Sequence, residues 1–203
     1  MPQSNMISSL RYTFGSKTKA QEILLLLHDA KKVVRHGFYE QELPRVEKFC
    51  NEQNLTIVKS KFKVLLADET SYSNKGIRIP GDDKRPGMYF VYLSKDEQKA
   101  WLASYYELMS NDRDLGILLG YPHCCVDFFC KRFSENNPNL QLPPKNPYTN
   151  LTKREQDCVL LSHFPCNSEC PESIVLAKNY LNVITQYDRH RAWEILQNLT
   201  QKE

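Results

Sequence analysis

Apolar residues recur at helical spacing near the start of the chain. Between residues 17 and 34 they fall on one face, which predicts a helix ended by Gly37; its apolar positions are Ile23, Leu24, Leu27, Ala30 and Val34. A second, shorter helix is expected after Pro44.

The pattern then becomes typical of strands. Leu55–Ala67 is rich in β-branched residues and predicts one long strand or two that meet near Ser60, and Met88–Leu93 predicts a further strand. The polar stretch between them, Asp68–Gly87, predicts an exposed excursion. These segments favour a small antiparallel sheet.

From residue 94 the helical period returns. Ser94 and Glu97 form a capping-box pattern before a helix whose predicted inner face holds Trp101, Leu102, Tyr105, Leu108 and Met109. A short helix is expected within 111–121. A second capping-box pattern, Thr152 and Glu155, predicts a helix that ends near His163. Residues 171–199 predict a helix with a break near 186–188.

This order of elements predicts an α+β fold, with a small antiparallel sheet followed by a mostly helical C-terminal half. A length of 203 residues is typical of a single domain. Within it we distinguish an N-terminal α/β part, residues 1–87, from a cysteine-motif region, residues 88–203.

Composition and charge are those of an ordinary globular protein, with 41% hydrophobic residues and a net charge of +3. No apolar run approaches the ~18 residues of a membrane span, and no secretion signal is visible at the N-terminus. We therefore expect a cytoplasmic protein. Basic runs at Lys31–His36 and Lys59–Lys63 are compatible with a nucleic-acid surface, but solvated helix and strand positions explain them more simply.

Two stretches concentrate the thiols: Leu118–Cys130 holds three of the seven cysteines, and residues 163–173 hold two more. Pro122 and Pro171 mark predicted helix starts, because proline favours the first helical position. The unpaired N–H groups at a helix start favour thiolates, which bind metals or act as nucleophiles. In a reducing compartment such a cluster indicates a metal or catalytic site.

A thiolate metal site needs about four donors. Adjacent helical side chains diverge by ~100° and do not easily share one ion, so we favour Cys125 over Cys124 as a ligand. We predict Cys125, Cys166 and Cys170 as ligands, with His163 or Cys124 as the fourth. Zinc and an iron–sulfur cluster both remain open as the cofactor. Further residues flank the thiols and are expected to hydrogen-bond the ligands: His123, Tyr121, Asp127 and Ser173.

Two other kinds of function remain open. A metal-independent enzyme would cycle these thiols through a disulfide, or activate one of them with His123 or His163. A binding or adaptor module would use a saturated, structural metal site. The remaining cysteines, Cys50, Cys130 and Cys158, are expected to pack as small apolar residues. Whether the chain is an enzyme, its substrate, its partners and its oligomeric state are not predicted.

The two cysteine stretches resemble an uncharacterised prokaryotic family, domain of unknown function 483, over roughly residues 88–182. The resemblance rests on a Gly-Tyr-Pro-x-Cys-Cys motif and a later His-x-Pro-Cys-x3-Cys-x2-Ser motif. It implies that the signature positions form one site; they are Gly120, Tyr121, Pro122, Cys124, Cys125, His163, Pro165, Cys166, Cys170 and Ser173. It implies nothing about substrate.

Overall fold

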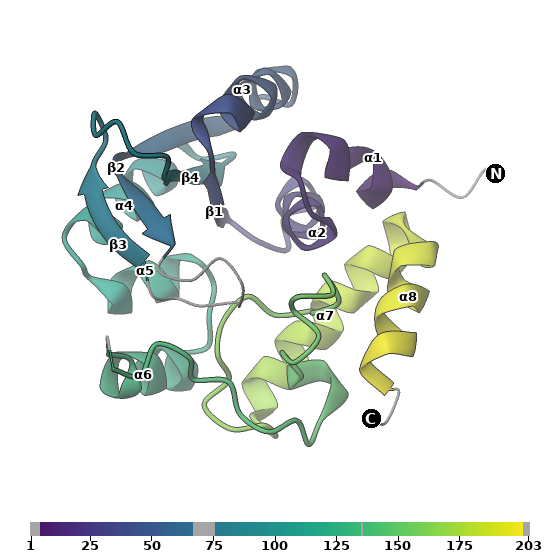
Figure 1. Ribbon diagram of the computed structural model, residues 1–203. Helices are drawn as coiled ribbons and strands as arrows, with labels where there is room; N and C mark the ends of the chain where they lie inside the picture. The colour runs from purple at the N-terminus through teal and green to yellow at the C-terminus, as the bar shows by residue number, and fades with distance from the viewer. Residues whose placement is uncertain (1–4, 67–75, 135, 201–203) are drawn as a thin grey trace. The chain divides into compact units, whose positions relative to one another are not determined.

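The computed structural model describes residues 5–66, 76–134 and 136–200 (Figure 1). The chain divides into two compact units. Unit 1 consists of residues 1–30, 121–132 and 140–203, and unit 2 consists of residues 31–120 and 133–139. Each unit draws on both predicted parts, 1–87 and 88–203. That the whole chain acts as a single domain stays a prediction.

Unit 2 is built on a four-stranded antiparallel sheet in the order β1-β4-β2-β3. The strands are β1 (Val33–Phe38), β2 (Thr56–Leu66), β3 (Gly76–Pro80) and β4 (Met88–Ser94). The predicted strands at 55–67 and 88–93 are thus confirmed within the described residues, which leave out position 67. Part of the predicted excursion, 68–75, also lies outside the described residues. The prediction was wrong at residues 76–80, because β3 pairs with the end of β2 there.

Strand β2 is one long strand with an irregularity at the position where the sequence suggested a break. Its register against β4 shifts between Lys59 and Lys63. The buried Ser60 hydroxyl donates to the Phe62 carbonyl and accepts from the Phe90 N–H, at 2.6 and 3.0 Å. These bonds satisfy backbone groups that the shifted ladder leaves unpaired.

The helices of unit 2 are α3 (Leu43–Glu52), which follows a short 3-10 turn η1 (Glu40–Glu42), then α4 (Glu97–Leu108) and α5 (Asp112–Leu118). Helix α4 packs on β2, β4 and β1. It begins at an N-cap of Asp96, whose side chain accepts from the Lys99 N–H. The predicted Ser94–Glu97 capping box was therefore wrong, because the Ser94 hydroxyl instead donates to the Lys32 carbonyl.

Helix α4 places a carboxylate, not its large apolar residues, against the sheet. Glu107 is 3% exposed, and Arg35 and Arg78 both form ion pairs with it, the latter at 2.8 Å. Arg35 stacks on Phe90 and Arg78 on Phe62. The buried side of α4 otherwise consists of Ala100 and Ala103.

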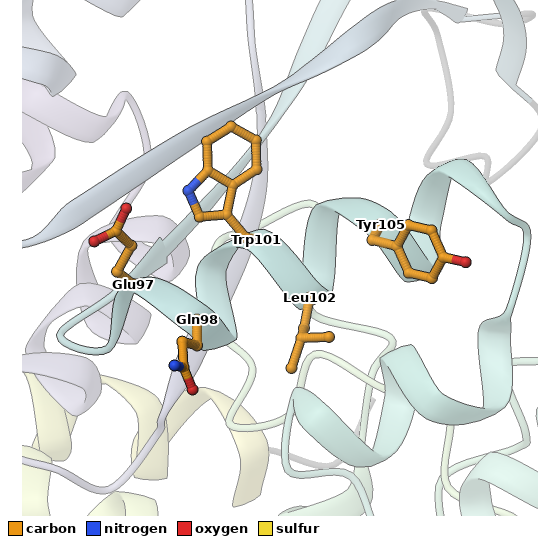
Figure 2. A pocket seen from close by; sticks show the side chains of 5 residues that line it. All are labelled: Glu97, Gln98, Trp101, Leu102 and Tyr105. Atoms are coloured by element: carbon orange, nitrogen blue, oxygen red, sulfur yellow. The ribbon is translucent and has the colours of Figure 1, made fainter.

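The predicted inner face of α4 is in fact its exposed face. The five large side chains expected inside are between 42% and 60% exposed; they are Trp101, Leu102, Tyr105, Leu108 and Met109. The helical period was correct, but the face predicted to be buried was wrong. The buried residues of α4 are instead Ala100, Ala103 and Glu107. Figure 2 shows a pocket on this exposed face, lined by Glu97, Gln98, Trp101, Leu102 and Tyr105.

Unit 1 is helical: α1 (Met6–Phe14), α2 (Lys17–Leu27), α6 (His123–Arg132), a 3-10 turn η2 (Pro147–Thr149), α7 (Pro171–Tyr187) and α8 (Arg189–Thr200). Helix α1, which the sequence analysis did not predict, packs on α2, and α2 packs on α7. The predicted break after α7 is confirmed at Asp188, whose buried carboxylate accepts from the Ile7 N–H at 2.9 Å.

The helix predicted at residues 17–34 is confirmed as α2, but its predicted end was wrong, and the helix predicted at residues 152–163 was wrong altogether. Helix α2 ends at Leu27, because Asp29 has a positive φ of 62° and the following Val33–Phe38 pairs as β1, including Gly37. The segment 152–163 forms turns instead of a helix. Asp157 has a φ of 61°, and its carboxylate accepts from the Lys17 and Thr18 N–H groups that begin α2. Asp157 therefore caps the start of α2 and is not part of a helix of its own.

The α+β fold class is confirmed, since a four-stranded antiparallel sheet is combined with eight α-helices among the described residues. Within the described ranges, no helix is both long and apolar enough to cross a bilayer.

Candidate metal centre

The first two cysteines lie in the opening turn of α6. The Pro122 carbonyl accepts the N–H groups of Cys125 and Val126, at 2.9 and 3.0 Å, which sets the start of the helix where Pro122 predicted it. Cys125 is 2% exposed and Cys124 is partly exposed. Both sulfurs therefore lie near a helix N-terminus, where N–H dipoles favour negative charge.

The other two cysteines precede α7. Cys170 is the N-cap, Pro171 is the first helical residue, and the Cys170 carbonyl accepts the Ile174 N–H at 3.0 Å. A tight turn before the helix is closed by a 3.0 Å bond from the Cys170 N–H to the Asn167 carbonyl. Cys166 lies at the start of this turn and is partly exposed, whereas Cys170 is 2% exposed.

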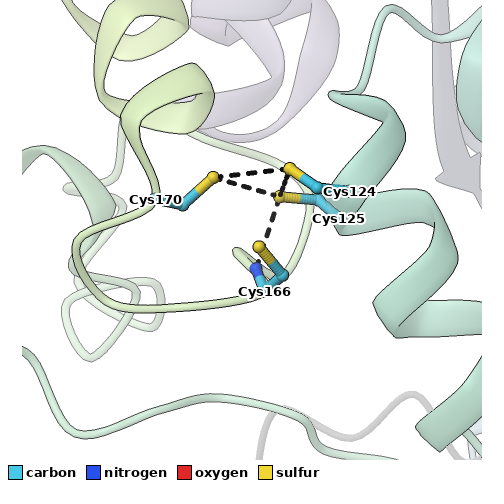
Figure 3. A group of neighbouring side chains, drawn as sticks. All are labelled: Cys124, Cys125, Cys166 and Cys170. Atoms are coloured by element: carbon cyan, nitrogen blue, oxygen red, sulfur yellow. Dashed lines mark hydrogen bonds between the residues drawn. The ribbon is translucent and has the colours of Figure 1, made fainter.

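The four sulfur atoms converge on one point (Figure 3). Cys124 Sγ lies 3.8 Å from Cys125 Sγ and 3.6 Å from Cys170 Sγ, and Cys125 Sγ lies 3.7 Å from Cys170 Sγ. With Cys166, all four sulfurs lie within 4.8 Å of one another. Two cysteine stretches separated by about forty residues therefore form a single group that can hold a metal ion.

Hydrogen-bond donors surround the buried sulfur of Cys125. The Cys166 N–H donates to Cys125 Sγ at 3.3 Å. The Ser173 hydroxyl, which is 0% exposed, lies 3.2 Å from Cys125 Sγ and 2.9 Å from His163 Nε2. The His163 ring is in turn tilted against the Tyr121 ring, with centroids 5.0 Å apart. His163, Ser173 and Cys125 thus form a buried chain of hydrogen bonds that ends at Cys125 Sγ.

The thiols differ in acidity. Burial raises the pKa of Cys125 to about 12, and it also raises the pKa values of Cys124 and Cys166. Burial acts on Cys170 in the same direction, but hydrogen bonds from Ser173 and from the neighbouring thiols outweigh it and hold its pKa below the ordinary value. One thiolate at Cys170 would therefore suppress ionisation of its neighbours unless a cation offsets the charge.

The structure brings together four of the predicted site residues and leaves the others outside the group. Among the described residues, the group that can hold an ion contains Cys124, Cys125, Cys166 and Cys170. His163, named above as one candidate for the fourth ligand, instead contacts Ser173. His123 is exposed and Asp127 half-buried, and neither belongs to the group. The Tyr121 hydroxyl lies 3.3 Å from the Ser162 hydroxyl.

The expectation that Cys124 and Cys125 could not point to one place was wrong. Their Cα–Cβ bonds diverge along the helix, but rotation about χ1 lets the two Cβ–Sγ bonds turn back toward each other. Their sulfurs end 3.8 Å apart and both approach Cys170. Adjacent cysteines at a helix start can therefore occupy two corners of one site.

Glu172 contacts the cysteine group but was not predicted as a site residue. Glu172, in the first turn of α7, has a carboxylate oxygen 3.7 Å from Cys124 Sγ. Its position two residues after Cys170 was the available signal, but it is also an ordinary position for a helix-capping acid. Of the other cysteines, Cys50 and Cys158 are buried as expected, whereas Cys130 is exposed, contrary to its predicted packing role.

Comparisons with known proteins add no relative. No family model matches the chain, and no curated protein or solved structure matches it either. The resemblance of its cysteine motifs to domain of unknown function 483 therefore stays a prediction, and the function is inferred from the geometry alone.

Proposed function

We propose that Cys124, Cys125, Cys166 and Cys170 bind one Zn²⁺ as a closed, tetrahedral, structural site. The observation that carries this proposal is the spacing of the sulfurs. Zinc–thiolate bonds are about 2.3 Å long, so the sulfurs of a regular tetrahedron around zinc lie about 3.8 Å apart. The sulfur–sulfur distances among Cys124, Cys125 and Cys170 are 3.6, 3.7 and 3.8 Å.

The same spacing disfavours the iron–sulfur alternative. In a cubane cluster each cysteine binds a different iron, which holds the sulfurs farther apart than a single ion does. Here all four sulfurs fall within 4.8 Å of one another. A single tetrahedral ion with four sulfur ligands fits this volume, and zinc is the usual occupant of such sites.

A four-thiolate site supports a structural role. Catalytic zinc has three protein ligands and keeps its fourth position for water or substrate. In this chain the fourth corner is a cysteine, and His163 Nε2 lies 2.9 Å from the Ser173 hydroxyl, outside the group of four sulfurs. An ion held here would join the start of α6 to the turn before α7, two segments otherwise distant in sequence. This favours the adaptor interpretation over hydrolytic chemistry, and a reducing, cytoplasmic setting suits it.

The test is the metal content of the protein purified without oxygen and without chelator. We expect one zinc per chain and a colourless solution. Iron with a strong visible band would overturn the choice of metal, and iron with sulfide would restore the cluster alternative. Absence of any metal would overturn the proposal.

A metal-independent thiol enzyme is the rival that the geometry also permits. Cys170 has a lowered pKa, and two further sulfurs lie within 3.7 Å of it. Such a protein would interconvert dithiol and disulfide without metal. The test is thiol–disulfide exchange in a model dithiol assay, before and after treatment of the protein with a chelator. Catalysis that is no slower after this treatment would favour this rival.

A further inference from the structure

We infer that Cys124 is an oxidant-sensitive position, at which a peroxide converts the zinc site into a Cys124–Cys170 disulfide and releases the ion. This inference rests on the zinc site proposed above. It assigns different roles to four ligands that a symmetric structural site would treat alike. The observations that separate them are exposure, hydrogen bonding, neighbouring charge and distance.

Exposure divides the ligands into two pairs. Cys125 and Cys170 are each 2% exposed, whereas Cys124 and Cys166 are partly exposed. A peroxide in solvent can therefore reach only the second pair without opening the fold. Oxidation of thiolates follows access to solvent together with thiolate character, and a bound zinc ion keeps all four sulfurs deprotonated.

Hydrogen bonds protect the buried pair further. Cys125 Sγ accepts the Cys166 N–H and lies 3.2 Å from the Ser173 hydroxyl. Such donors draw negative charge from a sulfur and lower its nucleophilicity. Cys125 is thus shielded from the oxidant both by burial and by hydrogen bonds.

Neighbouring charge distinguishes Cys124 from Cys166. The Glu172 carboxylate lies 3.7 Å from Cys124 Sγ. A negative charge beside a thiolate raises its basicity, and for thiolates nucleophilicity rises with basicity. Of the two accessible ligands, Cys124 is therefore the stronger nucleophile.

Of the two buried cysteines, distance favours Cys170 over Cys125 as the disulfide partner of Cys124. Cys170 Sγ lies 3.6 Å from Cys124 Sγ, nearer than Cys125 Sγ at 3.8 Å. A disulfide between the adjacent Cys124 and Cys125 is strained, because neighbouring Cα atoms are about 3.8 Å apart and disulfides prefer roughly 4.4–6.8 Å.

The chemistry balances in two steps. The Cys124 thiolate attacks hydrogen peroxide, the O–O bond breaks, and a sulfenic acid and hydroxide form; the hydroxide takes a proton to become water. The Cys170 thiolate then attacks the sulfenic sulfur, an S–S bond replaces the S–O bond, and a second hydroxide leaves and takes a proton. Two sulfurs have lost two electrons and the peroxide has gained them. Two thiolates remain at the site, too few to retain the ion.

The experiment uses zinc-loaded full-length protein, hydrogen peroxide as oxidant, and dimedone as a trap for sulfenic acid. Zinc release is followed with a chromogenic chelator, and labelled and disulfide-linked peptides are mapped by mass spectrometry. We expect dimedone on Cys124, a Cys124–Cys170 disulfide without dimedone, and about one zinc released per disulfide. A dithiol reductant should restore zinc binding.

Two variants sharpen the result. Glu172→Gln keeps all four sulfurs and removes the charge beside Cys124, so peroxide-driven release should slow roughly threefold to tenfold at unchanged zinc content. Cys130→Ser, which removes the exposed cysteine of the same helix outside the group, should leave the rate unchanged.

Three results would overturn the inference: dimedone or a disulfide on another ligand in place of Cys124, zinc retained under excess peroxide, or a Glu172→Gln rate equal to that of the unchanged protein. Protein that contains no zinc before peroxide is added would overturn the proposed function together with this inference. Zinc retained in peroxide would overturn this inference alone.

Discussion

The sulfur atoms of Cys124 and Cys125 lie 3.8 Å apart, and each lies within 3.7 Å of the sulfur of Cys170. The three sulfurs form a nearly equilateral triangle, which is one face of the tetrahedron that a zinc ion requires. Cys166 completes the group from the turn before α7. The tetrahedron therefore depends on an adjacent pair at one helix start and on two cysteines before another.

Replacing Cys166 should cost metal affinity. In Cys166→Ser the site loses a thiolate, and we expect zinc to bind at least roughly tenfold more weakly. A competition titration against a chromogenic chelator measures the change. The matched control is Cys130→Ser, an exposed cysteine outside the group, which should bind zinc as the unchanged protein does. Equal affinity in both variants would exclude Cys166 as a ligand.

Zinc binding should depend steeply on pH. Burial raises the pKa values of Cys124, Cys125 and Cys166, so these thiols are protonated near neutral pH in the metal-free protein. The ion binds the thiolate forms, so binding must release their protons, and the affinity must fall as the pH falls. Calorimetric titration of zinc at pH 7 in buffers of different ionisation enthalpy should count about three protons, one for each thiol with a raised pKa, and up to a fourth from Cys170, whose pKa is lowered. A count near zero would contradict four-thiolate binding.

Ser173 should tune the site without binding the ion. Ser173→Ala removes the hydroxyl that lies 3.2 Å from Cys125 Sγ and 2.9 Å from His163 Nε2. We expect zinc affinity to fall roughly tenfold to a hundredfold while one zinc per chain still binds at saturation. Ser162→Ala, whose hydroxyl instead lies near the Tyr121 hydroxyl, is the control and should bind zinc normally. If Ser173→Ala lost zinc at saturation, Ser173 would be needed to form the site, and the tuning role would be wrong.

The buried carboxylate of unit 2 should matter for stability. Glu107→Gln leaves Arg35 and Arg78 without their shared charge partner. Their side chains are 31% and 40% exposed and can be partly hydrated, so we expect a loss of about 1–2 kcal/mol of unfolding free energy. Asp83→Asn breaks the exposed pair with Arg85 and should have no measurable effect. Urea unfolding of both variants checks this. Equal midpoints for the two would show that the Glu107 cluster adds nothing.

Strands β2 and β4 and the C-terminal helices α7 and α8 could be predicted, because their periods are carried by their own residues, whereas β1 and β3 were missed. The errors arose where distant residues decide. Whether Trp101 or Ala100 faces the sheet depends on the space left by Glu107 and its two arginines, and local spacing does not encode that space. Likewise, Asp157 ends any helix at 152–163 by capping α2, a partner about 140 residues away in sequence.

The sequence indicated which residues form the candidate site better than it indicated how their side chains are arranged. Pro122, before the first cysteine pair, and Pro171, directly after the second, located two helix starts, and the structure has both. The sequence could not show that Cys124 and Cys125 converge, because this depends on side-chain rotation and not on helical period. Nor could it separate His163 as a ligand from His163 as a partner of Ser173, since both roles suit a histidine close to cysteines.

The most direct test of the central claim is X-ray absorption at the zinc edge of the purified protein. The account predicts a single shell of four sulfurs at about 2.3 Å with no nitrogen or oxygen ligand. A shell of three sulfurs and one nitrogen would place a histidine in the site and contradict the four-cysteine assignment. Absence of zinc from the sample, with iron in its place, would contradict the account of the metal itself.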